Sequence, residues 1–406
     1  MKLFRKVIFW CHLLTGVVVA LMTLIMSVTA VLLTYQRQII AWADTRDHRV
    51  APPAPEASRL PVEALIAKAR ESRTDTVPVT FTLQSDATKP AAIGAAGGRV
   101  IYINPSTGDV LGEGSKSVRD FFRVVVRWHT SLGASNENRA TAAAIIGACN
   151  LCLLFMVASG LYIWWPRSWS WPQVRNIIWF KRRLPGRARD FNWHNTIGFW
   201  SLAPILIVVS SGVVLSYRWA GDLVYRLAGE APPAPAQPAG NAAPQRAGSD
   251  RGALQSPLDG LNQLFLRAER QTTGWQSISL RIPQSVEAPI TFTIDHGNGG
   301  QPQKRAQLTL DRKSGEVIHW EPFSSYTTGR KMRSFMRFAH TGEVAGIVGQ
   351  TIAGVASLGG CFLVYTGVAL AFRRFRAWLA PRPKESTQPV SSLIEEAKDA
   401  KIAKNG

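Results

Sequence analysis

The sequence predicts an α-helical membrane protein with four transmembrane helices in two repeats and two small α+β domains outside the membrane. Three observations predict this fold class. The chain of 406 residues is 46% hydrophobic but only 18% charged, whereas about 25% of the residues of a soluble protein are charged. Its apolar residues are concentrated in four long stretches, and the order of apolar and polar segments occurs twice. These observations exclude a soluble enzyme, a disulfide-rich secreted module and a disordered chain.

Four stretches are long and apolar enough to cross a membrane, for which about 20 mostly apolar residues are needed. The first has no charge between Val7 and Leu33, which far exceeds the apolar part of a signal peptide, about 7–15 residues. We therefore interpret it as an uncleaved anchor, although residues 41–43 are similar to a cleavage site. The predicted segments are a first transmembrane helix within 1–35, a domain at 36–140, a second helix at 141–165, a loop at 166–193, a third helix at 194–219, a linker and domain at 220–343, a fourth helix at 344–372 and a tail at 373–406.

Basic residues are concentrated on one side of these spans. Lys2 and Lys6 precede the first span, the loop 166–193 is strongly basic, and the tail begins with Arg373. Since positively charged segments stay in the cytoplasm, we expect both termini and this loop there, and the two long segments on the opposite side. The net charge of +20 then reflects membrane topology and not a nucleic-acid partner.

The two long segments share one order of features. Each begins with a Pro/Ala-rich linker, which is typical of a spacer without a core. A helical pattern follows, then strand-like alternation, and then a strand with a tight turn in which Gly108 or Gly315 supplies a positive φ. We therefore interpret the chain as two copies of span, outer domain and span. The linkers begin at 51 and 231, the helical patterns lie at 61–70 and 258–269, the strand patterns at 77–83, 277–282 and 290–294, and the strand-turn units at 100–111 and 307–318.

Four histidines occupy matching places in the two copies. His12 and His194 open the first and third spans, so we expect both near the cytoplasmic face. His129 and His340 precede the second and fourth spans, so we expect both near the outer face. Ionisable residues in a membrane are costly and are functional by default. Two imidazoles at each face, from different helices, are what a six-coordinate haem requires. The sequence therefore predicts two bis-histidine haems with these four histidines as axial ligands of the iron.

A second interpretation stays open, in which each histidine only bonds a helix end or a lipid headgroup. His129 has the weakest case for ligation, because it lies four residues closer to its turn glycine than His340 does. Four residues are about one helical turn, so a ligand could keep its face.

Further residues fit haem sites or have ordinary roles. Gly16 and Gly198 lie one turn after their histidines, where a porphyrin would need space. Arg5, Arg127 and Arg337 are predicted to pair with haem propionates. We expect other polar or sulfur side chains to be solvated or simply packed: His48, His296, His319, Cys11, Cys149 and Cys152.

Short motifs appear in a distinctive order. His-x-x-x-Gly occurs at His12 and again at His194, Ser-Gly-Leu-Tyr-Ile-Trp-Trp-Pro occupies 159–166, and His-Thr-Gly-Glu occupies 340–343. In this order the chain resembles the PepSY-associated transmembrane family, which includes inner-membrane ferric-siderophore reductases. The resemblance implies two PepSY-like periplasmic domains and a bacterial inner-membrane location. It also implies b-type haems that carry electrons from the cytoplasmic side to a ferric chelate, with ligand roles for the four histidines.

The predicted function is an oxidoreductase that reduces Fe(III)-siderophore chelates in the periplasm and releases Fe(II). Adding one electron to ferric iron weakens its hold on hard oxygen ligands. No motif binds NAD(P)H or a flavin, so the electron donor is external, either a quinol or a cytoplasmic reductase. Catalytic side chains are not identified. Two alternatives are a non-enzymatic PepSY protein that regulates or inhibits a peptidase, and a siderophore or metal permease. Basic residues just outside the spans could attract an anionic chelate or anchor in headgroups: Arg119, Arg123, Lys331 and Arg333.

Overall fold

The computed structural model describes residues 2–46, 48, 50, 58–73, 77–165, 170–234, 256–283 and 285–380. Most of the two predicted linkers and the end of the predicted tail lie outside these residues. Within them, four helices are long and apolar enough to cross a membrane, which confirms this part of the predicted fold class. They are α1 (Lys2–Leu33), α5 (Arg139–Trp164), α7 (Gly186–Ser216) and α11 (Gly346–Leu379).

The four helices form a ring in which α1, α5, α7 and α11 each pack against two neighbours, so that α1 and α7 lie on opposite sides. Glycines permit close packing: an added Cβ at Gly359 would lie 2.6 Å from Ser201 Oγ, and one at Gly360 would lie 2.7 Å from Ser27 Oγ. The outer faces expose large apolar side chains such as Val18 and Val355. Lipid is the surrounding that makes such a surface stable.

Two of these helices are longer than expected. The third begins at Gly186 rather than at 194, because its first turns are held by buried Asp190, which pairs with Arg373 of α11. It ends at Ser216, since Tyr217 has an extended backbone. The fourth continues beyond 372 to Leu379. The start of α1, the loop between α5 and α7 with α6 (Trp171–Ile178), and the end of α11 therefore share one end of the bundle, called here the termini end.

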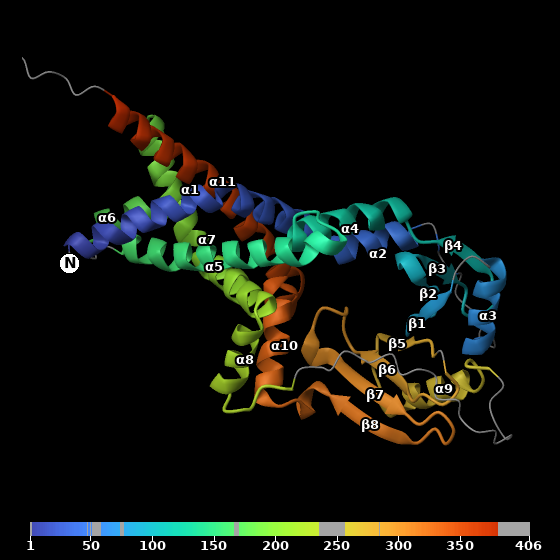
Figure 1. Cartoon of the computed structure of the whole chain (residues 1–406). Coiled ribbons are helices and arrows are strands. Elements are labelled where there is room, and N and C mark those ends of the chain that lie inside the picture. Colours follow the sequence, from blue (N-terminus) through green and yellow to red (C-terminus); the bar gives the residue numbers. More distant parts are fainter. Residues whose placement is uncertain are drawn as a thin grey trace, which may run out of the picture.

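Shorter helices occupy the other end, called here the sheet end (Figure 1). One pair is α2 (Gln36–Thr45) and α4 (Lys116–Ser131), and α4 packs on α1 and α5. The other pair is α8 (Arg218–Leu227) and α10 (Thr328–His340), and α10 packs on α7. Each pair thus connects a long helix to the sheet. Short 3-10 helices lie at Ala96–Gly98, Asn136–Asn138, Pro302–Lys304, Phe323–Ser325 and Glu343–Ala345.

The strands of both polar segments join one antiparallel sheet in the order β4-β3-β2-β1-β5-β6-β7-β8. β1 of the first segment pairs directly with β5 of the second, so that Phe81 lies opposite Leu280. Gly108 and Gly315 have positive φ in the tight turns, as expected. The strands are β1 (Pro78–Gln84), β2 (Ala91–Ala95), β3 (Val100–Ile103), β4 (Val110–Glu113), β5 (Ser277–Arg281), β6 (Ile290–Asp295), β7 (Arg305–Leu310) and β8 (Val317–Pro322).

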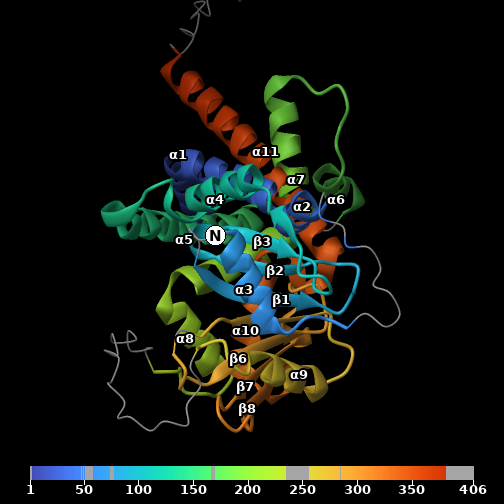
Figure 2. The same ribbon diagram turned by 90° about the vertical axis from the view of Figure 1, so that its right-hand side faces the viewer.

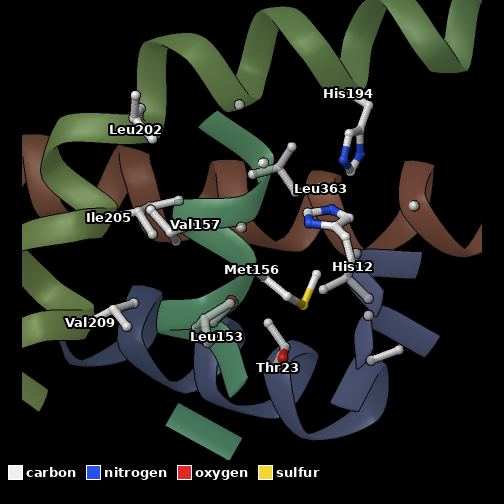
Figure 3. A pocket seen from close by; sticks show the side chains of 18 of the residues that line it. His12, Thr23, Leu153, Met156, Val157, His194, Leu202, Ile205, Val209 and Leu363 are labelled. Carbon is white, nitrogen blue, oxygen red and sulfur yellow. The ribbon is translucent and has the colours of Figure 1, made fainter. Parts of the chain in front are cut away.

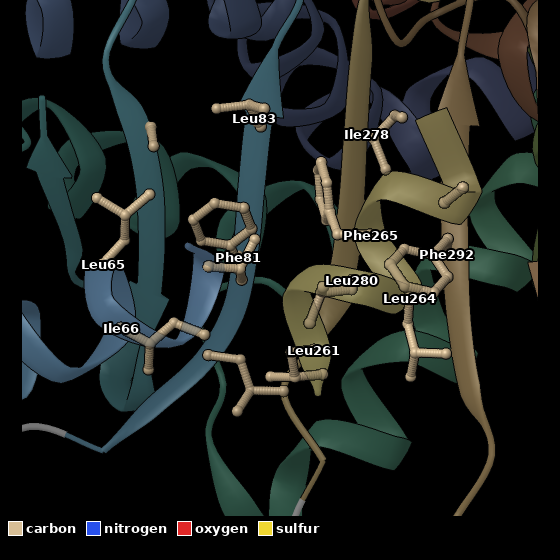
Figure 4. Close-up of a cluster of buried hydrophobic side chains, with 14 of the residues drawn as sticks. Leu65, Ile66, Phe81, Leu83, Leu261, Leu264, Phe265, Ile278, Leu280 and Phe292 are labelled. Carbon is tan, nitrogen blue, oxygen red and sulfur yellow. The ribbon is translucent and has the colours of Figure 1, made fainter. Parts of the chain in front are cut away.

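Two helices, α3 (Val62–Ser72) and α9 (Leu261–Gln271), cover the sheet (Figure 2). Phe81, Phe265 and Phe292 are fully buried in one hydrophobic core that both segments share (Figure 4). The rings of Phe81 and Phe265 meet edge to face at 5.6 Å. The sequence predicts two separate domains for these segments, whereas in the structure they share one sheet and one core.

Candidate cofactor-binding site

A cavity of about 430 Å³ lies inside the helical bundle. It receives side chains from all four long helices and from α4 and α10. Most of the lining is apolar, with Met156, Leu202 and Val209 among the side chains shown in Figure 3. All four histidines that the sequence singled out line this cavity: His12, His129, His194 and His340.

His12 and His194 form a couple at the termini end of the cavity. They extend from α1 and α7, on opposite sides of the ring, and their imidazoles approach each other (Figure 3). His12 Nδ1 lies 2.9 Å from Ser159 Oγ on α5. His194 Nδ1 lies 2.9 Å from Thr366 Oγ1 on α11. Each ring is therefore held by a hydroxyl on a neighbouring helix.

His129 and His340 form the second couple, at the sheet end. Their ring centres lie 6.3 Å apart. An imidazole nitrogen lies about 2 Å from a metal ion that it binds, and the ring centre about 1 Å behind it, so two rings on opposite sides of one ion are about 6 Å apart. His129 Nδ1 lies 2.8 Å from Thr29 Oγ1 of α1. His340 Nδ1 lies 2.9 Å from the carbonyl oxygen of Val208 in α7. The spacing of this couple suits two axial ligands of one ion.

These hydrogen bonds determine the tautomers of three of the histidines, His129, His194 and His340. A hydroxyl has a single hydrogen to donate, and the hydroxyls of Thr29 and Thr366 donate theirs to carbonyls one turn earlier, at 2.7 and 2.8 Å. The oxygen must then accept from Nδ1. The Val208 carbonyl can only accept from His340. Nδ1 therefore carries the proton, and Nε2 keeps the lone pair that binds a metal. A metal-ligating histidine usually donates its other N–H in this way.

The two couples are built from matching positions. The number of residues from His12 to His194 equals the number from Thr29 to Ser211. Thr29 bonds to His129, and Ser211 Oγ lies 3.3 Å from His340 Nδ1. Gly16 and Gly198 are separated by that interval too. A Cβ on these glycines would lie 3.0 Å from Met156 and 3.7 Å from Leu363 respectively, and both side chains line the cavity.

Glycines also leave room for the imidazoles. A Cβ at Gly160 would lie 3.4 Å from His12 Cε1, and one at Gly367 would lie 3.4 Å from His194 Cε1. Gly212 has the same relation to His340, at 3.3 Å. An added Cβ would just touch the rings, so a side chain larger than that of alanine at these positions would displace them.

The two histidines outside the spans favour the neutral form. Burial lowers the pKa of His129 to about 4, with a smaller contribution from the charge that His340 could carry. Burial likewise lowers the pKa of His340. Neutral imidazole is the form that binds metals, so both rings are ready for ligation at neutral pH.

The arginines at the cavity differ from those expected. Arg5 donates to the carbonyl of Ile163 on α5, Arg127 is half-buried on α4 and Arg337 is exposed on α10. Among the described residues, the arginines that line the cavity are instead Arg187 and Arg374.

The remaining polar residues are placed as follows. His48, expected in solvent, is half-buried and stacks on Tyr102 with ring centres 5.5 Å apart. His319 is exposed, and its Nε2 lies 3.6 Å from a carboxylate oxygen of Glu321. The Nε2 atom of His296 shares a hydrogen bond with the hydroxyl of Thr272. The cysteines of the described chain are all free, and none of them lines the cavity.

Three of the outer basic residues already have partners. Arg119 pairs with the buried carboxylate of Asp44, and Arg123 pairs with Asp120 at 2.6 Å. Lys331 donates to a backbone carbonyl at 2.8 Å. These contacts reduce what such residues offer to an anionic chelate.

The hydroxyls that orient the histidines were not predicted from the sequence, although one sequence signal indicates them. Ser159 and Thr366 each precede a glycine, Gly160 or Gly367, and these two glycines are equally far from the turn glycine of their own segment. A hydroxyl at the same place in two apolar spans is unusual and indicates a buried polar partner.

The donor set and its surroundings fit haem. Two imidazole couples, each from two different helices, lie near the two ends of one apolar cavity, and each ring is oriented by a hydrogen bond at Nδ1. The glycines beside the rings leave the space that side chains would fill. Metal-binding groups of three or more His, Cys, Asp or Glu are absent from the described chain.

Fold and site together define a membrane protein whose four helices enclose an apolar, histidine-lined cavity. In a comparison with known families, residues 9–374 match the PepSY-associated TM region. The chain therefore belongs to the PepSY-associated transmembrane family, in agreement with the resemblance seen in its motifs. A search of curated proteins found no match.

Proposed function

We propose that this protein is an inner-membrane reductase that carries two b-type haems and reduces Fe(III)-siderophore chelates in the periplasm. The observation that supports it best is the pairing of four imidazoles, His12 with His194 and His129 with His340, at the two ends of one cavity. Each couple would hold one haem iron. Bound haem would supply one-electron redox chemistry.

The protein's own residues have three tasks in this proposal. The imidazoles bind the iron through Nε2, and Ser159, Thr366 and Thr29 keep the rings in the tautomer and orientation that ligation needs. The apolar lining excludes water. The placement of one couple near each end of the bundle divides the membrane, roughly 30 Å of hydrocarbon, into shorter distances for electrons.

The basic residues support the orientation with both termini in the cytoplasm, because the loop 166–193 and the end of α11 share the termini end with the start of α1. The sheet would then lie in the periplasm, and the couple of His129 and His340 would be the one nearer the chelate. The matching intervals between residues of the two couples favour an origin by duplication of one unit. The electron donor would act from the cytoplasmic side, as a quinol or a reductase.

The test is the haem content of the full-length protein purified in detergent. We expect two low-spin b-type haems per chain by pyridine haemochrome, and reoxidation of the reduced protein by a ferric hydroxamate with release of Fe(II). His12→Ala and His194→Ala should remove the same haem, and the double variant should lose no more than either one. His129→Ala and His340→Ala should remove the other haem.

His319→Ala is the matched control, since His319 is exposed on β8, and it should keep both haems. A folded but colourless protein would contradict the proposal and favour a regulatory PepSY protein. Uptake of an intact chelate into liposomes without a reductant would favour a permease.

A further inference from the structure

Arg187 on α7, Arg374 on α11 and Trp164 on α5 carry N–H donors and line the cavity toward its termini end. Arg187 precedes His194 by seven residues, which is about two helical turns or 10 Å along α7. Trp164 lies one turn beyond Gly160, the glycine that packs against His12. The three donors therefore lie beyond the couple of His12 and His194, toward the end of the bundle.

Asp190, the acidic residue near this end of the cavity, is already paired with other arginines. Asp190 is buried and pairs with Arg189 and with Arg373, each at 3.0 Å. In the described part of the chain, neither Arg187 nor Arg374 forms an ion pair with a carboxylate. Two arginines that line one cavity and pair with no carboxylate of the described chain are suited to an anion that comes from outside it.

The contacts of Arg374 and Trp164 favour the same conclusion. The Arg374 guanidinium lies over the rings of Phe9 and Trp10, at 5.0 and 4.8 Å from their centres, and this stacking leaves the N–H groups at its edge able to donate. Trp164 Nε1 is buried and has no hydrogen-bond partner among the described residues. A buried donor without a partner is unfavourable, and an acceptor in the cavity would remove that cost.

Arg5 is not available for this task. It stands at the position that corresponds to Arg187, by the interval that separates His12 from His194. Its guanidinium donates to the backbone carbonyls of Ile163 and Trp165, the latter at 3.4 Å, at the end of α5. Corresponding residues of the two halves thus have different roles, and only Arg187 lines the cavity.

We infer that Arg187, Arg374 and Trp164 form an anchor for the two carboxylates of the haem held by His12 and His194. This inference rests on the proposed function and replaces Arg5 as the partner of the propionates at this end. A phosphate of an anionic lipid offers similar chemistry to the same three donors, so the experiment must separate the two sources.

The experiment compares the full-length wild-type protein with Arg187→Gln, Arg374→Gln and Trp164→Phe in detergent, by redox titration of the haem absorbance and by resonance Raman of the propionate modes. Loss of a cation beside the propionates favours the ferric form. For each arginine variant we expect about a tenfold shift in the ferric-to-ferrous ratio of one haem, which is about 59 mV for one electron. Trp164→Phe should change the propionate modes.

Single-haem backgrounds identify which haem responds. In His129→Ala, which keeps the haem at the termini end, the shift should persist; in His12→Ala it should vanish. Arg376→Gln is the matched control, because Arg376 lies over Phe372 on the same helix and does not line the cavity. It should leave both potentials unchanged.

Two results would overturn the inference while leaving the proposed function intact. One is a wild-type protein with two haems whose potentials and propionate modes are the same in all three variants. The other is a loss of copurified anionic lipid in the arginine variants without any shift in potential. A wild-type protein without haem would instead defeat the proposed function itself.

Discussion

Thr366 Oγ1 lies 2.9 Å from His194 Nδ1 and 2.8 Å from the carbonyl oxygen of Phe362 in the preceding turn. The hydroxyl hydrogen goes to the carbonyl, so the oxygen accepts from the imidazole. This relay anchors the His194 ring to the backbone of α11. A histidine held in this way has lost most of its rotational freedom before any ligand arrives, and its ring lines the cavity.

Thr366→Val should therefore weaken haem binding without removing a ligand. Valine keeps the shape of threonine but cannot accept the Nδ1–H. Loss of such a partner typically lowers metal affinity by about 10–100-fold, so we expect partial loss of one haem by pyridine haemochrome and a broader low-spin signal by electron paramagnetic resonance.

Thr366→Ser is the matched control, because it keeps the hydroxyl, and it should retain the wild-type haem content. Equal loss in the serine and valine variants would mean that the methyl group of Thr366, and not its oxygen, matters.

There is little space for a side chain at position 367, because the ring of His194 lies beside Gly367. A Cβ there would lie 3.4 Å from His194 Cε1, which a small adjustment accommodates. Gly367→Ala should thus keep both haems, whereas Gly367→Val should displace the ring and lose one haem, as His194→Ala does. The comparison is made by haem content per chain. A valine variant that keeps both haems would show that the ring has room to move.

The shared core predicts that the two polar segments unfold together. Phe265 of α9 is fully buried and touches the rings of Phe81 at 5.6 Å and Phe292 at 6.0 Å. Phe265→Ala should cost about 3–5 kcal/mol. Hydrogen exchange should then accelerate in α3 and β1 of the first segment as well as in α9.

Leu266→Ala is the control for this core, because the neighbouring Leu266 is 37% exposed. It should leave the exchange of both segments near the wild-type rates. If Phe265→Ala affected only the second segment, the segments would be two independent domains, as the sequence alone indicated.

The sequence predicted the four long helices because a lipid-facing helix needs an unbroken apolar stretch, which is a local property. It predicted the strands at 77–83, 277–282 and 290–294 for a similar reason, their alternation. The pairing of β1 with β5 is not local. Two separate sheets and one joined sheet bury the same alternating residues, so the pattern could not distinguish them.

At the site, the four histidines were found from their type and position, since an ionisable side chain beside a span needs a reason to be there. The arginines could not be sorted in the same way. Arg5 and Arg187 have the same chemistry and matching positions. Their roles differ only because Arg5 donates to backbone carbonyls at the end of α5. That contact depends on where two helices end relative to each other.

Alkaline pH offers a test of the junction between the bundle and the sheet. Tyr102 of β3 donates to Asp44 Oδ2 of α2 at 3.1 Å, and Asp44 also pairs with Arg119 of α4. Burial, followed by the charge of Asp44, raises the pKa of Tyr102 to about 12, compared with about 10 in an unfolded chain. The folded state thus favours the neutral phenol. The raised pKa of Tyr102 therefore contributes to the free energy of unfolding. The contribution is fully present below pH about 10 and is lost as the pH rises toward about 12.

Tyr102→Phe removes this contribution, so we expect the wild-type protein to be the more stable of the two up to pH about 10 and the difference to narrow above it. Thermal unfolding in detergent, followed by circular dichroism at several pH values, measures that difference. Ultraviolet titration of the phenolates provides a second readout, in which the variant should lack one late-titrating tyrosine. A stability difference that stayed constant through this range, or a titration curve that lost an early tyrosine instead, would show that the phenol of Tyr102 is not held by Asp44 in solution.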